Sequence, residues 1–195
     1  MISAGEIARK LIHLFNLSIP IRYVYIIPYK NQMTITMIVF AILFVIIDLA
    51  RMRSGFVKKI FNKLFNFMMR EHEIGGRFTG ATWVLIISVP IIYFFPKEIA
   101  VLSLVYMSLG DIAAAIIGQS FGKTKIGKKT LEGSIGCLTV CAVAALIINN
   151  VPLLVSMSGA VMATIFEALP INIDDNILIP IGAGTTMVVV SSFIL

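Results

Sequence analysis

The residues best suited to chemistry in this sequence lie between positions 110 and 134, where a carboxylate, glycines and lysines follow one another. Asp111 falls inside an apolar run, where an unpaired carboxylate would be costly, so it is a candidate for holding a cation or accepting a proton. Gly118 follows two helical turns later and shares a helix face with Asp111. The pattern predicts a site where Asp111 meets a charged ligand.

A loop rich in glycine and lysine comes next. Glycines allow a ligand to approach the backbone, and lysines balance phosphate charge. The next helix should begin near Glu132, with Ser134 as its cap and with free amide groups that favour a phosphate. We take residues 118–134 as a phosphate-binding loop. Its candidate phosphate-binding residues are Gly118, Gly122, Lys123, Lys125, Lys128, Lys129, Glu132, Gly133 and Ser134.

The nearest familiar phosphate-binding motif is the P-loop, which needs Gly, four residues and then Gly-Lys-Ser/Thr between a strand and a helix. Here Gly118 is one residue too close to Gly122, and an apolar helix precedes it. A soluble nucleotide fold is therefore not expected. A loop whose lysines only follow membrane topology is the other alternative, but topology does not call for Asp111 or Glu132.

Apolar helices must position these residues. The chain has 195 residues, of which 58% are hydrophobic and 13% charged, whereas a soluble domain carries about a quarter charged residues. Apolar runs of bilayer length predict an all-α, polytopic transmembrane helical bundle with about seven spans, built as a single domain over residues 1–195. The runs cover 11–28, 33–50, 79–95, 98–117, 134–149, 151–168 and 177–194.

Two segments depart from a simple span. The first run contains Pro20 and Arg22, so it should be kinked or partly re-entrant. Residues 55–70 place phenylalanines on one helical side and lysines on the other, which favours an amphipathic helix on the membrane surface over a soluble connector.

Threading the runs as alternating spans puts nearly all charges on one side. Of the 16 basic residues only Arg22, Lys30 and Lys97 fall on the other side, so the crowded side is predicted to be cytoplasmic. Of the 10 acidic residues only Glu98 falls on the other side. The positive-inside rule does not require the acidic residues to gather on the cytoplasmic side. The basic residues lie between apolar runs, so membrane topology explains them better than nucleic-acid binding. Carboxylates beside lysines at helix ends instead predict a cytoplasmic site for Mg²⁺ and phosphates.

Some charges have a structural alternative. Asp48 and Arg51 are expected to form an ion pair at the end of the second span. Asp174 and Asp175 precede a helix, so capping of that helix competes with metal binding.

Four segments, in order, resemble the dolichol kinase, phytol kinase and CTP-dependent diacylglycerol kinase family of membrane lipid kinases. They are Glu-Ile-Ala-Arg-Lys-Leu-Ile-His at 6–13, the Gly-Asp helix at 110–118, Lys-Thr-Leu-Glu-Gly-Ser at 129–134, and a closing segment with Glu-Ala-Leu-Pro at 167–170, Asp-Asp-Asn at 174–176 and Pro180. The resemblance spans residues 5–185. It implies a membrane lipid kinase that transfers the γ-phosphate of CTP, or of ATP, to a lipid alcohol with Mg²⁺ as cofactor.

The resemblance also implies roles for individual residues. Catalytic roles fall to Asp111, Arg9, Lys10 and His13. Residues 118–134 become the nucleotide loop, and nucleotide binding extends to Thr130. The implied metal ligands are Asp111, Glu132, Glu167, Asp174, Asp175 and Asn176. Asp111 would hold Mg²⁺ or accept the hydroxyl proton. The chain departs from the family at Gln119 and Thr124, where relatives often carry basic residues.

Two other functions remain. Transmembrane cytidylyltransferases are similar in their Gly/Ser-Asp helix and Lys-Thr-x-Glu-Gly ending, and would make a CDP-linked lipid instead. A small transporter would place its charges near the midplane and show an inverted repeat, whereas these charges gather at one interface. The implied acceptor is a polyprenol, another isoprenoid alcohol or diacylglycerol.

Overall fold

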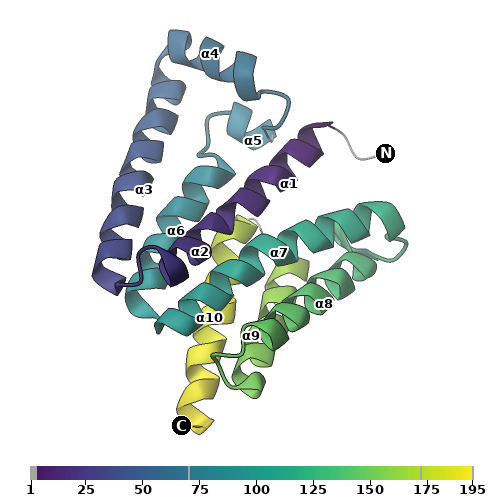
Figure 1. Ribbon diagram of the computed structural model, residues 1–195. Coiled ribbons are helices and arrows are strands. Elements are labelled where there is room, and N and C mark those ends of the chain that lie inside the picture. Colours follow the sequence, from purple (N-terminus) through teal and green to yellow (C-terminus); the bar gives the residue numbers. More distant parts are fainter. Residues whose placement is uncertain (1–3, 70, 172, 195) are drawn as a thin grey trace.

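The computed structural model describes residues 4–69, 71–171 and 173–194, and folds them almost entirely into helices (Figure 1). The all-α class is therefore confirmed. In chain order the helices are α1 (Ala4–Asn16), α2 (Ser18–Tyr25), α3 (Lys30–Arg53), α4 (Gly55–Phe65), α5 (Glu71–Ile74), α6 (Gly80–Phe94), α7 (Lys97–Phe121), α8 (Leu131–Ile147), α9 (Leu153–Ala168) and α10 (Asp175–Ile194). A short antiparallel hairpin, β1 (Lys125–Ile126) and β2 (Lys129–Thr130), joins α7 to α8.

Helix α7 is the centre of the core. It packs against α8, α9 and α10 and also against α1 and α2. Side chains along it, including Leu102, Leu104 and Tyr106, are fully buried. The Tyr106 hydroxyl donates a hydrogen bond to the backbone carbonyl of Ser156 in α9, at 3.0 Å. Because α7 carries Asp111 and leads into the hairpin, this packing fixes the position of the candidate site.

The first apolar run is broken, as predicted. Helix α1 ends at Asn16 and α2 begins at Ser18. Pro20 lies in the first turn of α2, where its missing amide hydrogen is not needed for a helical hydrogen bond. The break leaves α1 as a separate helix that packs against α7.

Three of the described helices, α3, α7 and α10, are long and apolar enough to cross a membrane, while α6, α8 and α9 are apolar but shorter. The prediction of about seven spans is therefore not confirmed by helix length. Helix α3 exposes a row of apolar side chains that includes Ile35, Val39 and Leu43. Such a surface requires a hydrocarbon environment, so the chain is a membrane protein.

Helix α4 is shorter than the predicted amphipathic helix. It ends at Phe65 and is followed by a turn, and Arg70 lies outside the described residues. The Ser54 hydroxyl caps its start by accepting from the amide of Val57. Phe56 is exposed on its outer side, whereas the ring of Phe61 lies 5.2 Å from the Arg51 guanidinium. Its place on the membrane surface stays a prediction.

The predicted pair between Asp48 and Arg51 is present and buried, with Arg51 Nε 3.0 Å from Asp48 Oδ1. Arg51 also donates to the backbone carbonyl of Glu73, and Asp48 accepts from the hydroxyls of Thr79 and Thr82. A buried ion pair is tolerated only when its remaining donors and acceptors are satisfied. The network ties α3 to the segment that leads into α6.

Candidate functional site

Two residues of α1 contact Asp111 of α7. Lys10 Nζ donates to Asp111 Oδ2 at 2.9 Å and to the Asp111 backbone carbonyl at 3.3 Å. His13 Nδ1 lies 3.6 Å from the same carboxylate oxygen. Lys10 and His13 are one helical turn apart and share a face of α1. The structure thus brings together three of the candidate catalytic residues, Lys10, His13 and Asp111. The side chain of Glu6, in the same sequence segment, lies outside the described residues.

Gly110 explains how α7 and α8 can approach each other beside Asp111. A Cβ atom on Gly110 would lie 2.9 Å from Cys137 Sγ and 3.1 Å from Cys141 Sγ. Both cysteines are buried and free. The missing side chain therefore allows close packing on this side of α7, while Asp111 contacts α1.

The hairpin between α7 and α8 was not predicted. Residues 118–121 remain in α7, and the hairpin turns at Gly127, whose φ of +59° is a conformation that residues with a side chain rarely adopt. The prediction that Ser134 caps α8 is wrong. Thr130 is the cap, because its hydroxyl accepts from the amide of Gly133 at 3.2 Å. Strand β2 ends at Thr130, so α8 begins directly after it and Thr130, not Ser134, is the N-cap.

Glycines bring the start of α8 against the end of α7. A Cβ atom on Gly118 would lie 2.8 Å from Thr130 Oγ1, and one on Gly133 would lie 2.7 Å from the Ala114 carbonyl oxygen. A Cβ atom on Gly122 would also collide with Thr130. These glycines therefore allow the close packing of α7 against the start of α8.

Lys129 connects the hairpin to α9 and α10. Its Nζ lies 2.9 Å from Asp175 Oδ2 and 3.2 Å from Glu167 Oε1, and it also donates to the Glu167 backbone carbonyl. The Ser134 hydroxyl donates to the other carboxylate oxygen of Glu167, at 3.2 Å. Burial lowers the pKa of Lys129, but the charges and hydrogen bonds of Asp175 and Glu167 outweigh it, and the net effect raises this pKa. The ammonium group is therefore charged at neutral pH.

These side chains line one cavity of about 730 Å³, which we call the phosphate cavity. Cations from α1 and the hairpin and carboxylates from α7 and α9 line it together. Its lining includes Lys10, Asp111, Gly118, Gly122, Lys125, Lys128, Lys129, Thr130, Gly133 and Glu167. Lys125 and Lys128 are exposed and available to a ligand. A cavity of this size is typical of small-molecule sites, which span about 300–1,000 Å³.

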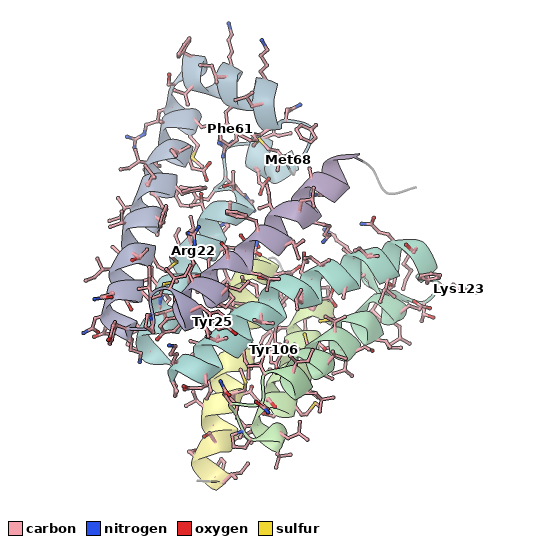
Figure 2. All side chains as sticks on the ribbon, in the orientation of Figure 1. Arg22, Tyr25, Phe61, Met68, Tyr106 and Lys123 are labelled. Atoms are coloured by element: carbon pink, nitrogen blue, oxygen red, sulfur yellow. The ribbon has the colours of Figure 1, made fainter. Side chains whose placement is uncertain are left out.

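Several predicted site residues lie outside the phosphate cavity. Lys123 is exposed beyond the end of α7, far from Arg22 (Figure 2). Glu132 is half-buried and its carboxylate accepts from the backbone amide of Thr124, at 3.1 and 3.2 Å, so it holds the loop. Arg9 and His13 line a different cavity.

The two aspartates at the start of α10 have different partners. Asp174 accepts from the backbone and side-chain amides of Asn176, at 3.0 and 2.7 Å, which is the capping contact expected as the alternative to metal binding. Asp175 instead contacts Lys129. Both aspartates border a third cavity of about 1050 Å³, which shares Lys128 and Lys129 with the phosphate cavity.

The residues of the phosphate cavity suit Mg²⁺ by their chemistry. Among the described residues, no three His, Cys, Asp or Glu side chains converge closely enough to hold a metal ion by themselves. Mg²⁺ commonly takes only one or two carboxylates and completes its shell with water and substrate phosphates. Asp111 and Glu167 both line the cavity and offer such oxygens. This donor set fits Mg²⁺ bound together with a nucleotide.

Sequence reasoning missed Ala114 and Ala115, which line the phosphate cavity one turn after Asp111. Their small side chains leave room for a ligand beside the carboxylate. The signal was present in the sequence, since residues three and four positions apart share a helix face.

The fold and site together define a helical membrane protein with a cavity lined by lysines and carboxylates. No family model and no solved structure matches the chain. The chain is, however, a homologue of the CTP-dependent diacylglycerol kinases, which confirms the resemblance to the CTP-dependent lipid kinases.

The similarity extends over nearly the whole chain. The chain is 29% identical over 216 residues to CTP-dependent diacylglycerol kinase 1 of Saccharomyces cerevisiae. The alignment covers 95% of this chain and 73% of that protein. The enzyme of the same name from Eremothecium gossypii is 24% identical over 224 residues, covering 98% of this chain and 69% of the relative. The Schizosaccharomyces pombe enzyme is 33% identical over 99 residues, covering 49% of this chain and 44% of the relative.

Proposed function

We propose that this protein is a membrane lipid kinase that transfers the γ-phosphate of CTP to the hydroxyl of a lipid alcohol. Diacylglycerol is the proposed acceptor, because the named relatives are CTP-dependent diacylglycerol kinases. The observation that carries the proposal is the phosphate cavity, which Asp111 and the lysines of the hairpin line together.

The triphosphate occupies the phosphate cavity. Lys125 and Lys128 are exposed at its edge, and Lys10 reaches it from α1. Four negative charges of a triphosphate need cations that are already in place, and phosphoryl transfer depends mainly on such positioning and neutralisation. Lys129 contributes less directly, because Glu167 and Asp175 hold its ammonium group.

In the transfer step the lipid hydroxyl oxygen attacks the γ-phosphorus. The bond between that phosphorus and the β–γ bridging oxygen breaks, CDP leaves, and the lipid becomes a phosphate monoester. The hydroxyl proton passes to the pair formed by His13 and Asp111, whose atoms Nδ1 and Oδ2 lie 3.6 Å apart. A base in this position contributes by taking the proton as the new bond forms.

Asp111 and Glu167 are the carboxylates proposed to hold Mg²⁺ at the edge of the phosphate cavity. When bound there, Mg²⁺ supplies positive charge to the phosphate oxygens. Ser134 and Lys129 orient the Glu167 carboxylate through hydrogen bonds.

The site is proposed to lie on the cytoplasmic face of a single membrane domain. The start of α3, with Lys30, and the hairpin lie at opposite ends of predicted spans, and the hairpin side carries most of the lysines and arginines. The α1–α2 pair and the shorter helices α6, α8 and α9 would complete about seven crossings together with the three long helices.

The test uses purified protein with γ-labelled CTP and a panel of diacylglycerol, a polyprenol and phytol. The expected result is label in phosphatidic acid, dependent on Mg²⁺, with ATP as a comparison donor. Transfer of cytidine with release of pyrophosphate would identify a cytidylyltransferase instead. Absence of label in every lipid would contradict the proposal.

A further inference from the structure

A second cavity, of about 390 Å³, is lined by other residues of α1 than the phosphate cavity, among them Ile12 and His13. We call it the apolar cavity. Its walls come from α1, α3, α4 and the first turn of α6, and Phe61 and Met68 are seen between α4 and α1 in Figure 2. The apolar side chains that line it include Ile12, Phe44, Ile47, Phe61, Phe65 and Met68.

Buried polar side chains form one part of the apolar cavity. His13, Asp48, Glu73 and Thr82 all line it and are all nearly excluded from solvent. The Thr82 hydroxyl donates to Asp48 at 2.7 Å, and the Gly80 amide donates to Glu73 at 2.8 Å. The fold therefore fixes these polar groups beside an apolar wall. A cavity of this kind suits an amphiphile with a polar end and a hydrocarbon body.

The two cavities meet at α1 and Asp111. His13 lines the apolar cavity, and its Nδ1 lies 3.6 Å from Asp111 Oδ2. Lys10 lines the phosphate cavity and donates to that same oxygen. A hydroxyl group beside His13 would therefore lie next to the carboxylate that borders the nucleotide.

The helices around the apolar cavity also face lipid. At least half of the surface is exposed for each of four apolar side chains: Leu11 and Leu14 of α1, Ile46 of α3 and Phe56 of α4. In a membrane these surfaces contact acyl chains. The outer surface around the apolar cavity is thus apolar, as the approach of a lipid from the bilayer requires.

We infer that the apolar cavity binds the glycerol end of the diacylglycerol acceptor, with its free hydroxyl beside His13 and its acyl chains leaving toward the bilayer. This assignment rests on the proposed phosphoryl transfer. The volume of about 390 Å³ suits the glycerol backbone and the first part of the chains rather than a whole lipid.

The first test fills the cavity by the substitution Ala81→Phe. Ala81 lines the apolar cavity and is half-buried, whereas Ala50 of α3 is also half-buried but does not line it, so Ala50→Phe is the matched control. Ala81→Phe should raise the KM for diacylglycerol by about tenfold or more, because added bulk excludes the ligand. The KM for CTP should not change, and the control should resemble the native protein. An unchanged KM for diacylglycerol in a folded Ala81→Phe protein overturns the assignment.

The second test needs no turnover. A diacylglycerol analogue with a photoreactive group near its glycerol is irradiated with the native protein in vesicles, and the labelled peptides are mapped. Label within residues 9–16, 44–48, 61–69 or 79–82, which line the cavity, supports the assignment if unlabelled diacylglycerol reduces it, even if Ala81→Phe fails to fold. Label confined to other helices overturns it. Native protein that is labelled there but transfers no phosphate from CTP would refute the proposed function while leaving the lipid site in place.

Discussion

Lys10 in α1 donates a hydrogen bond to Asp111 in α7 across 2.9 Å, although the two residues are 101 positions apart in the chain. Both side chains are largely buried, with 15% and 13% of their surface exposed. A pair of this kind fixes the carboxylate in one orientation. It is the contact through which the opening segment of the chain completes a site carried by the central helix.

Replacement of Asp111 by Asn should abolish transfer while preserving the fold. The amide keeps the size of the side chain but loses the charge, and removal of a catalytic acid or base costs about 10²- to 10⁴-fold in rate. Glu98→Gln, in the first turn of the same helix, is the matched control because Glu98 is exposed at the opposite end. Label transfer and thermal unfolding of both variants give the comparison; full activity of Asp111→Asn would refute the role of this carboxylate.

Neighbouring lysines of the hairpin should respond differently to substitution. Lys129→Met leaves Glu167 and Asp175 without their cation, and should lower the free energy of unfolding by about 1–3 kcal/mol. Lys128→Met removes an exposed charge, so it should raise the KM for CTP without changing the unfolding temperature. Equal unfolding temperatures for the two variants would contradict a structural role of Lys129.

The stabilisation by Lys129 should not depend on pH near neutrality. Its carboxylate partners raise the pKa of this lysine. A raised pKa in the folded state gives stability that is fully present below the ordinary lysine pKa of about 10.4 and is lost only as the pH rises through the folded-state value. The unfolding temperature of the native protein should therefore exceed that of Lys129→Met by the same margin at about pH 7 and pH 9. A margin that shrinks between these values would contradict this ionisation state.

The contact between α7 and α8 should not tolerate a side chain at Gly118. A Cβ atom there would lie 2.8 Å from Thr130 Oγ1, so Gly118→Ala should destabilise the protein by about 1–3 kcal/mol. Gly55→Ala is the control, because a Cβ atom on Gly55 meets nothing within 4 Å. Thermal unfolding in detergent measures the stability of both variants. An unchanged stability of Gly118→Ala would contradict this prediction and show that α8 can move away from α7.

Membrane orientation can be tested by labelling single cysteines from one side. Cys137 and Cys141 are fully buried, so they should be silent toward a membrane-impermeant maleimide. Lys128→Cys should react from the cytoplasmic side, and Asn31→Cys at the start of α3 from the opposite side. Reaction of both from the same side would contradict the threading of the chain.

Hydrophobic runs predicted the helices well, because burial in lipid requires long apolar segments whatever their tertiary packing. The grouping of Lys10, His13 and Asp111 followed from family resemblance, since periodicity within a helix cannot say which helices meet. The hairpin escaped prediction because β1 and β2 are two residues long and depend on Gly127 at the turn. The residue type of Ser134 favours a cap, but α8 begins earlier, at Leu131, and Thr130 caps it.

In the proposed reaction this chain transfers the terminal phosphate of CTP to a lipid hydroxyl. The most direct measurement supplies diacylglycerol with CTP labelled at either the α- or the γ-phosphate and follows the label into extracted lipid. The native protein should place γ-label in phosphatidic acid, Asp111→Asn should place none, and α-labelled CTP should label no lipid. Lipid labelled from the α-phosphate, or γ-transfer that survives in Asp111→Asn, would contradict the proposed reaction and its site.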